Sequence, residues 1–568
     1  MGKNKVPIFF CLFLCLIESK LFSQTTLDYD ERVHPEIAKN FMVVSQNKYA
    51  TEAGYKILEQ GGNAIDASVA VGFALAVTLP RAGNLGGGGF MLIYKSDSQE
   101  ISTIDYRSAA PESAKSEMYL SDSGVIRFGH LVNAVPGSVA GLIKAHREHG
   151  ILPLKKVLMP AIELARKGIP VSYDLNYILE WGKASMLENS ASKEKFYNNS
   201  EKPLELASQF KQPKLAKTLT LISHKGDEVF YKGKIADWIV EDSKIHGGLI
   251  TKKDLALYKA KSRNPIETSY RGYRIVSMAP VASGGLVLLQ TLNILENFNL
   301  SELGHNSASS LHLLSEAMLR AYADRTRYHG DPDFFNVPVS KLLDKIYAKE
   351  RTKTINIGSK TPSKNIFPGN IPLLDESPDT THFSVIDSEG NAVANTYTLG
   401  SSFGSGVTVP NGGFLLNNQM RNFSHYYGKL EATDLRTSSA NKLEPGKRMI
   451  STQTPTLVFN PEGDLFMILG SPGGGRIPNI ITQIISNVID HKLGFADAVM
   501  APRINQRIGK DLELESGFSP DTLELLKDRG HQLNISTTMG SVQAIFIKDG
   551  YLYGVSDTRR PGAKAKGN

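Results

Sequence analysis

Apolar residues recur at helical spacing in the first part of the chain. Within residues 51–60 the apolar positions share one helical face, and Gly61-Gly62 then ends the pattern, which predicts a helix. Residues 66–78 predict a second helix, rich in Ala and Val, and this segment is too short to cross a membrane. After a glycine run at 86–89, residues 91–94 have the composition of a strand.

The pattern changes from mainly helical to β-rich near residue 380. Before this point, helical patches such as 161–167 and 309–327 alternate with Pro and Gly turns. After it, 382–386 and 392–398 predict a hairpin around 387–391. Further strands are predicted at 413–416, 456–459 and 465–469, a helix after Ile480, and a last hairpin at 544–547 and 551–553. The mixture, without internal repeats, predicts an α/β protein, as one large assembly or as several domains.

The first 23 residues resemble a secretory leader. Lys3 and Lys5 precede an apolar run from Val6 to Ile17, and Ser23 is a small residue suited to cleavage. Both cysteines of the chain lie in this segment, and lipid attachment at Cys15 is an alternative to signal-peptide cleavage. We therefore expect a periplasmic or secreted protein with no stable membrane span, and a mature chain that has no thiol for disulfides or metal.

The charge balance argues against a nucleic-acid partner. The formal net charge of the 568 residues is +7, and the leader contributes part of it. The remaining charge is small for so long a chain and shows no basic cluster. With 41% hydrophobic and 21% charged residues, the composition is that of an ordinary globular protein with a large core.

Common catalytic and nucleotide-binding motifs are absent or occur in the wrong context. The chain has no GxxxxGK[ST] and no HExxH sequence. Residues 400–404 match GxSxG, but the Gly- and Pro-rich stretch that follows cannot form the helix that a nucleophile elbow needs. The glycines at 86–89 do not have the GxGxxG spacing, so a dinucleotide site is not predicted there.

The segment 379–385, Asp-Thr-Thr-His-Phe-Ser-Val, carries the most informative chemistry. A threonine hydroxyl is a weak nucleophile unless a base takes its proton, and the α-amino group of the same residue can serve as that base. This arrangement requires the chain to be cut before Thr380. A polar turn before a strand is the simpler interpretation of the same residues.

The segment resembles the processing site of the γ-glutamyltranspeptidase family, whose members are self-cleaving N-terminal-nucleophile hydrolases. The similarity extends from about residue 40 to about residue 560 and includes, in the order of the family, the blocks 61–64, 83–90, 105–107, 270–273, 330–333, 416–420 and 470–474. It implies a four-layer αββα sandwich made of two chains from one precursor. These chains are residues 24–379 and 380–568, which form one intertwined unit and need no metal or organic cofactor.

The resemblance also implies roles for individual residues. Thr380 matches the nucleophile and Thr398 the threonine that hydrogen-bonds its amino group, while Gly473 and Gly474 match the oxyanion hole. At the other end of the substrate, Arg107, Ser451 and Thr452 match the groups that hold the α-carboxylate.

The chain departs from the family where the substrate α-ammonium is bound. The family usually has Asn, then Gln or Glu, then Asp at three positions where this chain has Gly400, Gln419 and Asn422. The formal negative charge is therefore missing, and a neutral amide binds an ammonium more weakly than a carboxylate does.

Three functions follow from these residues. The leading one is cleavage of γ-glutamyl amides such as glutathione-like compounds through a threonyl acyl-enzyme, with transfer of the acyl group to water or to an amino-acid or peptide acceptor. The second is an acylase for glutaryl-type amides, which lack the α-amine; Asn422 favours it. The third is an inactive binding protein, against which the retained Thr380, Thr398 and Arg107 argue.

Overall fold

The structure is a computed structural model and describes residues 32–122, 124–366, 379–425, 438–536 and 538–568. The leader predicted at residues 1–23 lies outside the described residues. Within them, no helix combines the length and the hydrophobicity that a membrane span requires.

Two antiparallel sheets form the centre of the molecule, and in the described residues each has seven strands. The order in the first sheet is β21-β2-β12-β13-β3-β4-β9, and the order in the second is β1-β20-β19-β15-β14-β11-β10. The bounds in the first sheet are β2 Met42–Ser45, β3 Gly88–Lys95, β4 Glu100–Asp105, β9 Lys261–Ser262, β12 Asp379–Ile386, β13 Ala392–Gly400 and β21 Lys564–Gly567. Those in the second are β1 Glu36–Ala38, β10 Ile266–Tyr270, β11 Tyr273–Ser277, β14 Thr456–Phe459, β15 Leu465–Gly470, β19 Gln543–Lys548 and β20 Tyr551–Ser556.

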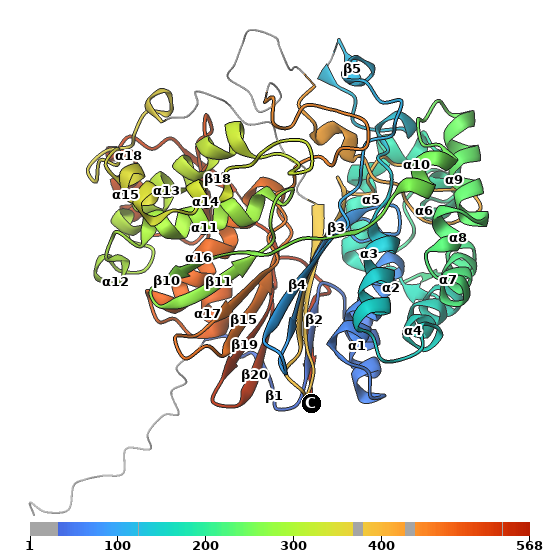
Figure 1. The fold of residues 1–568 in the computed structure, drawn as a ribbon, viewed down its shortest axis with the longest axis horizontal. Helices are drawn as coiled ribbons and strands as arrows, with labels where there is room; N and C mark the ends of the chain where they lie inside the picture. Colours follow the sequence, from blue (N-terminus) through green and yellow to red (C-terminus); the bar gives the residue numbers. More distant parts are fainter. Residues whose placement is uncertain (1–31, 123, 367–378, 426–437, 537) are drawn as a thin grey trace, which may run out of the picture.

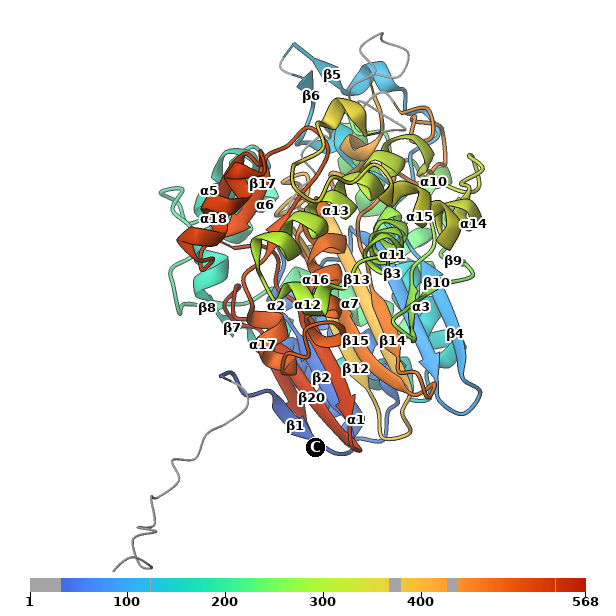
Figure 2. The ribbon, with the colours of Figure 1, turned by 90° about the vertical axis from the view of Figure 1, so that its left-hand side faces the viewer.

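Helices cover the outer face of each sheet (Figure 1). Against the first sheet pack α1 Lys48–Glu59, α2 Ala64–Thr78, α3 Ser138–His149, α4 Leu154–Lys167 and α7 Pro213–Lys225. Against the second pack α11 Ser283–Leu295, α13 Ala308–Tyr328, α16 Ile477–Ile489 and α17 Phe495–Met500. Figure 2 looks onto this second group of helices, with the sheets behind them. The order of layers is helix, sheet, sheet, helix, which confirms the predicted αββα sandwich.

Smaller elements complete the fold. The helices are α5 Tyr173–Leu187, α6 Ser190–Phe196, α8 Glu228–Tyr231, α9 Lys234–Ile245, α10 Lys252–Leu257, α12 Leu300–Leu303, α14 Val339–Leu342, α15 Lys345–Thr352 and α18 Pro520–Asp528. The strands are β5 Leu120–Ser121, β6 Gly124–Val125, β7 Ile169–Pro170, β8 Gln209–Phe210, β16 Ile504–Asn505, β17 Leu512–Glu515 and β18 Leu533–Ser536.

The apolar composition of the strands follows from the burial of both their faces. In β3, Met91 and Ile93 join the core under α2, while Phe90 and Leu92 join the core between the two sheets. Successive side chains of a strand point to opposite faces, so a strand in the middle of four layers needs apolar residues at nearly every position. This is why the strands at 91–94, 456–459 and 465–469 were visible in the sequence as apolar runs.

Each sheet combines strands from both sides of Thr380. β2, β3 and β4 of the first sheet precede this residue, β12 contains it, and β13 and β21 follow it. The predicted hairpin is present as β12 and β13, and the helix predicted at 66–78 is α2. The strand predicted at 413–416 is wrong: Leu415 and Leu416 make isolated bridges to Thr408 and Gly86 without forming a ladder.

Candidate active site

Thr380 lies at an irregularity in the pairing of β12 with β13. Asp379 pairs with Gly400 and Thr381 with Tyr397, so the register shifts around Thr380 and sets it opposite Thr398 and Leu399. A bulge of this kind re-aims a side chain and weakens the local ladder. The side chains of Thr380 and Thr398 are both 4% exposed. The structure therefore brings the predicted nucleophile and its predicted partner together in a buried position.

The face of β12 that carries Ser384 and His382 is directed at the second sheet. The hydroxyl of Ser384 lies 3.2 Å from the carbonyl oxygen of Ile468 and 3.0 Å from that of Gln543, both in the second sheet. Nδ1 of His382 lies 2.7 Å from Oγ1 of Thr396 on β13. Burial lowers the pKa of His382 to about 3, so its imidazole is neutral and serves the packing of the sheets.

The glycine turn after β15 continues toward the end of β12 where Thr380 lies. Ile468 of β15 contacts Ser384, and Gly470 packs against the ring of His382, so the two segments run past each other in opposite directions. Gly473 and Gly474 follow in this turn. Their φ angles are +142° and +55°, a region that favours glycine. Among the described residues, no acceptor pairs with their N–H groups.

Thr452 connects this turn to the segment predicted to hold the substrate carboxylate. Its hydroxyl donates to the carbonyl oxygen of Gly474 at 2.8 Å. The backbone of the neighbouring Ser451 is fixed by a hydrogen bond: its N–H donates to the carbonyl oxygen of Val281 at 3.1 Å. The hydroxyl of Ser451 accepts a bond from the N–H of Gln453 at 3.3 Å, which leaves its proton for another acceptor.

Arg107 reaches the same segment from the first sheet. Its Nε donates to the carbonyl of Met449 at 3.2 Å and its Nη2 to that of Ile450 at 3.3 Å. The residue is 1% exposed. Tyr106 exchanges backbone hydrogen bonds with Gly89 of β3, next to the position where β3 pairs with Thr398. The arginine is thereby held beside the segment that continues into Ser451 and Thr452.

A buried carboxylate behind Arg107 had no role in the sequence analysis. Oδ1 of Asp105 accepts from the N–H of Arg107 at 3.0 Å. The same side chain pairs with Arg448 at 2.7 Å and with Arg263 at 2.8 Å, and its exposure is zero. Asp105 thus fixes the backbone that carries Arg107. The motif 105–107 was visible in the sequence, but only the fold shows which cations meet there.

Gln419 contacts the backbone of Thr398 and has one amide atom unused. Its Nε2 donates to the carbonyl oxygen of Thr398 at 2.8 Å. Because that partner is an acceptor, the amide nitrogen must face it, and Oε1 faces away. Oε1 is buried and has no hydrogen-bond partner among the described residues. This oxygen is therefore an available hydrogen-bond acceptor beside Thr398 on β13.

The two positions that depart from the family, Gly400 and Asn422, are both half-buried. Asn422 is half-buried at the end of the 3₁₀ helix Gln419–Asn422, and its carbonyl accepts from Nδ2 of Asn441 at 2.7 Å. Gly400 has φ +105°, and a Cβ there would lie 2.2 Å from Oδ1 of Asn418. The local backbone therefore favours glycine at position 400, whatever the substrate.

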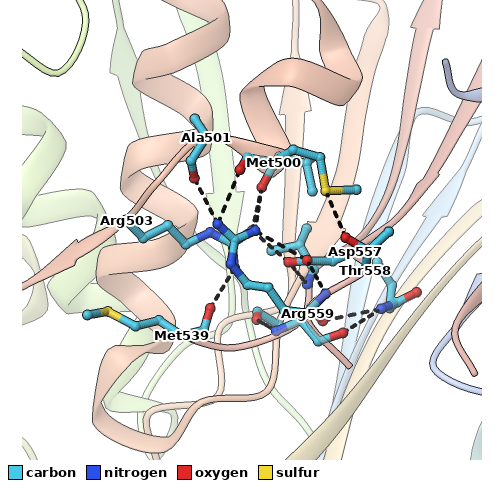
Figure 3. Close-up of polar contacts among 12 residues, drawn as sticks. Met500, Ala501, Arg503, Met539, Asp557, Thr558 and Arg559 are labelled. Atoms are coloured by element: carbon cyan, nitrogen blue, oxygen red, sulfur yellow. Dashed lines mark hydrogen bonds and ion pairs between the residues drawn. The ribbon is translucent and has the colours of Figure 1, made fainter. Parts of the chain in front are cut away.

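A network of buried ion pairs supports the glycine turn from behind (Figure 3). Arg503 binds Asp557 at 2.7 Å and the carbonyl of Met539 at 2.6 Å. Burial alone would raise the pKa of Asp557, but Arg503 and Arg559 hold it below its usual range. Gly540, next to Met539, lies against Gly473. The network thus fixes the loop on which the predicted oxyanion turn rests.

The described residues contain one cluster suited to a metal ion, His130, Asp242 and His246, and none of these was predicted as a site residue.

Comparison with known proteins identifies the wider similarity. A family model described as Gamma-glutamyltranspeptidase matches residues 50–567. The glutathione hydrolase proenzyme of Escherichia coli (strain K12) is 45% identical over 533 residues, which cover 93% of this chain and 91% of that protein.

Acylases are also among the similar proteins. The acylase ACY 1 proenzyme of Pseudomonas sp. (strain SE83) is 37% identical, with 94% of this chain and 95% of that protein covered. Among solved structures, the cephalosporin acylase from Bacillus halodurans superposes with a TM-score of 0.83 at 28% identity and covers 96% of this chain and 99% of its own.

Proposed function

The chain belongs to the gamma-glutamyltranspeptidase family, and from this premise we propose that it is a self-cleaving hydrolase and transferase of γ-glutamyl amides. The proenzyme names of the similar proteins support maturation by cleavage. The leader at residues 1–23 supports a periplasmic or extracellular location for the mature enzyme.

Maturation begins with attack by Oγ1 of Thr380 on the carbonyl carbon of Asp379. The peptide C–N bond breaks, the α-amino group of Thr380 is released with a proton, and water hydrolyses the resulting ester. The new amino group is then the base that takes the hydroxyl proton in each turnover. The bulge at Thr380 supports this step because the scissile peptide lies where the ladder is already interrupted.

Turnover repeats the attack on the γ-carbonyl of the substrate. The hydroxyl oxygen forms an ester with the γ-glutamyl group, and the amine leaves with the proton held by the α-amino group. Water or an amino-acid or peptide acceptor then resolves the ester. The N–H groups of Gly473 and Gly474 stabilise the oxyanion in both halves, and loss of one such donor typically raises the barrier by about 3 kcal/mol.

One observation carries the proposal: the described contacts link the predicted groups to one another at one end of the sandwich. Thr398 lies opposite Thr380 and accepts from Gln419, and Thr452 donates to Gly474. These residues are far apart in the sequence. Arg107 and Ser451 are the proposed partners of the α-carboxylate of an α-amino acid head group, and the unused oxygen of Gln419 is the proposed partner of its ammonium.

The test is the variant Thr380→Ala. We expect a single uncut chain without activity on γ-glutamyl-p-nitroanilide, because one hydroxyl serves both reactions. Thr380→Ser keeps a hydroxyl and an α-amine and should mature slowly, with some activity. A light chain that begins at residue 380 in Thr380→Ala, detected by mass spectrometry, would refute the assignment.

A second candidate function is hydrolysis of glutaryl amides, favoured by Asn422, which carries no negative charge where the family has Asp. The similar acylase proenzyme supports it. The unused Oε1 of Gln419 favours a substrate with an ammonium, since a glutaryl group has no donor to offer there. Initial rates on γ-glutamyl and glutaryl anilides at equal concentration decide between the two.

A further inference from the structure

Three side chains that commonly ligate metals meet away from the active site. Asp242 and His246 lie one turn apart at the end of α9, and His130 approaches them from the 3₁₀ helix His130–Val132. Nε2 of His130 lies 3.0 Å from Oδ2 of Asp242, and Nδ1 of His246 lies 3.3 Å from Oδ1. The two imidazole rings are stacked, with centroids 4.5 Å apart and planes 13° from parallel.

These separations agree with the ligand spacing of a tetrahedral zinc ion. Zn–N and Zn–O bonds of about 2.0–2.1 Å place neighbouring ligand atoms about 3.3 Å apart. The candidate ligand atoms here all lie within 4.8 Å of one another. Because the stacked ring planes do not meet at a common centre, one imidazole must turn to bind the ion, and the half-exposed His246 is the ring with room to turn.

The charge balance of the cluster favours a cation. Asp242 is 5% exposed, and His130 and His246 are its ionic partners among the described residues. A buried carboxylate needs a compensating charge. A divalent ion would compensate the carboxylate while both imidazoles stay neutral.

The cluster is also open to solvent on one side. The side chain of His246 is 48% exposed, whereas those of His130 and Asp242 are 8% and 5% exposed. An ion can therefore enter past His246, and water can fill the remaining coordination position. Nδ1 of His246 lies 3.0 Å from the carbonyl oxygen of Asp242. A metal bound at Nδ1 of His246 would replace that contact.

We propose that His130, Asp242 and His246 form a binding site for one zinc-class divalent ion, Zn²⁺ in the first instance. Imidazole and carboxylate are suitable ligands for this class. The ion would fasten the segment around His130 to α9. That segment also bonds to the loop before Gln419, because the N–H of Gly129 donates to Ser405 at 2.9 Å and that of Ala134 to Asn417 at 3.0 Å.

The test is Zn²⁺ binding to the full chain, purified with a tag that lacks histidine and dialysed against a chelator. Isothermal titration should give one Zn²⁺ per chain, and added Zn²⁺ should raise the melting temperature. His246→Ala should weaken binding at least about tenfold, since even outer-shell changes at metal sites weaken binding by roughly 10–100-fold. His224→Ala, which removes an exposed histidine of α7, is the matched control and should bind like wild type.

Asp242→Asn provides an independent variant that keeps the shape of the buried side chain and removes its charge; it should also lose binding. The proposal is overturned if wild type takes up no more Zn²⁺ than His246→Ala, or if His224→Ala loses as much affinity as His246→Ala does. Because the readouts are bound metal and melting temperature, the result does not depend on the proposed enzymatic activity.

Discussion

Thr452 and Ser451 are neighbours whose hydroxyls make different contacts. Thr452 has one hydroxyl proton, and it is directed at the carbonyl oxygen of Gly474. Ser451 accepts from Gln453 and retains its proton for a substrate carboxylate. We therefore expect Thr452→Val to loosen the oxyanion turn, and Ser451→Ala to weaken substrate binding.

The expected magnitudes follow from the type of hydrogen bond lost. Valine has the shape of threonine, and the carbonyl of Gly474 keeps the N–H of Ile477 as a partner, so Thr452→Val removes the neutral bond to Gly474 while that carbonyl stays paired. Such a bond contributes about 1 kcal/mol, which is roughly a fivefold decrease in kcat. The bond from Ser451 to a carboxylate is charged and worth about 1.5–3 kcal/mol, roughly a tenfold to hundredfold decrease in kcat/KM.

Steady-state kinetics on γ-glutamyl-p-nitroanilide and the fraction of cleaved chain on a denaturing gel measure both effects. Thr452→Val should lower kcat and slow maturation, because both reactions use the same turn. Thr452→Ser keeps the hydroxyl and is the control, with nearly unchanged kcat. A Thr452→Val enzyme with normal kcat, normal maturation and a raised KM would show that Thr452 binds the carboxylate and that the reasoning is wrong.

The remaining predictions concern the two ends of the substrate. Arg107→Lys should raise KM at least about tenfold for substrates with an α-carboxylate, because a single ammonium replaces the two parallel hydrogen bonds of a guanidinium. Cleavage of the precursor, measured on a denaturing gel, should stay nearly normal. An unchanged KM would place Arg107 outside the substrate site. Asn422→Asp should raise kcat/KM for γ-glutamyl anilides relative to that for glutaryl anilides by roughly tenfold to a hundredfold. The reason is that the new carboxylate would form a charged hydrogen bond with the substrate ammonium, worth about 1.5–3 kcal/mol. The guanidinium of Arg421, which donates to Ser401 at 2.8 Å, lies next to it in the sequence and would reduce the effect if it paired with the new carboxylate; a constant ratio would mean that residue 422 does not face the amine. Gly400→Asn should lower the melting temperature, because φ is +105° there and a Cβ would lie 2.2 Å from Oδ1 of Asn418. We expect this strain to cost about 1–3 kcal/mol of folding free energy. An unchanged melting temperature would contradict the expectation.

Local pattern predicted the elements whose burial is repetitive. Helix α2 was visible as a run of Ala and Val because all its residues are buried, and β12 and β13 were visible because a polar turn separates two apolar runs. The strand predicted at 413–416 shows the limit of this reasoning. Its apolar residues are buried as expected, but no neighbouring backbone is aligned to continue a ladder beyond isolated bridges.

The sequence by itself determined the fold class and, through resemblance, the identity of the candidate residues from Arg107 to Gly474. It could not assign their hydrogen bonds, because these depend on which groups meet after folding. The contacts of Gln419 with Thr398, of Thr452 with Gly474 and of Asp105 with its two arginines join segments far apart in the chain. The side chains of His130 and Asp242 are likewise brought together across 112 positions. Local propensity is decided by neighbours in sequence, whereas these partners are decided by the packing of two sheets and their helices, and only the tertiary structure specifies that packing.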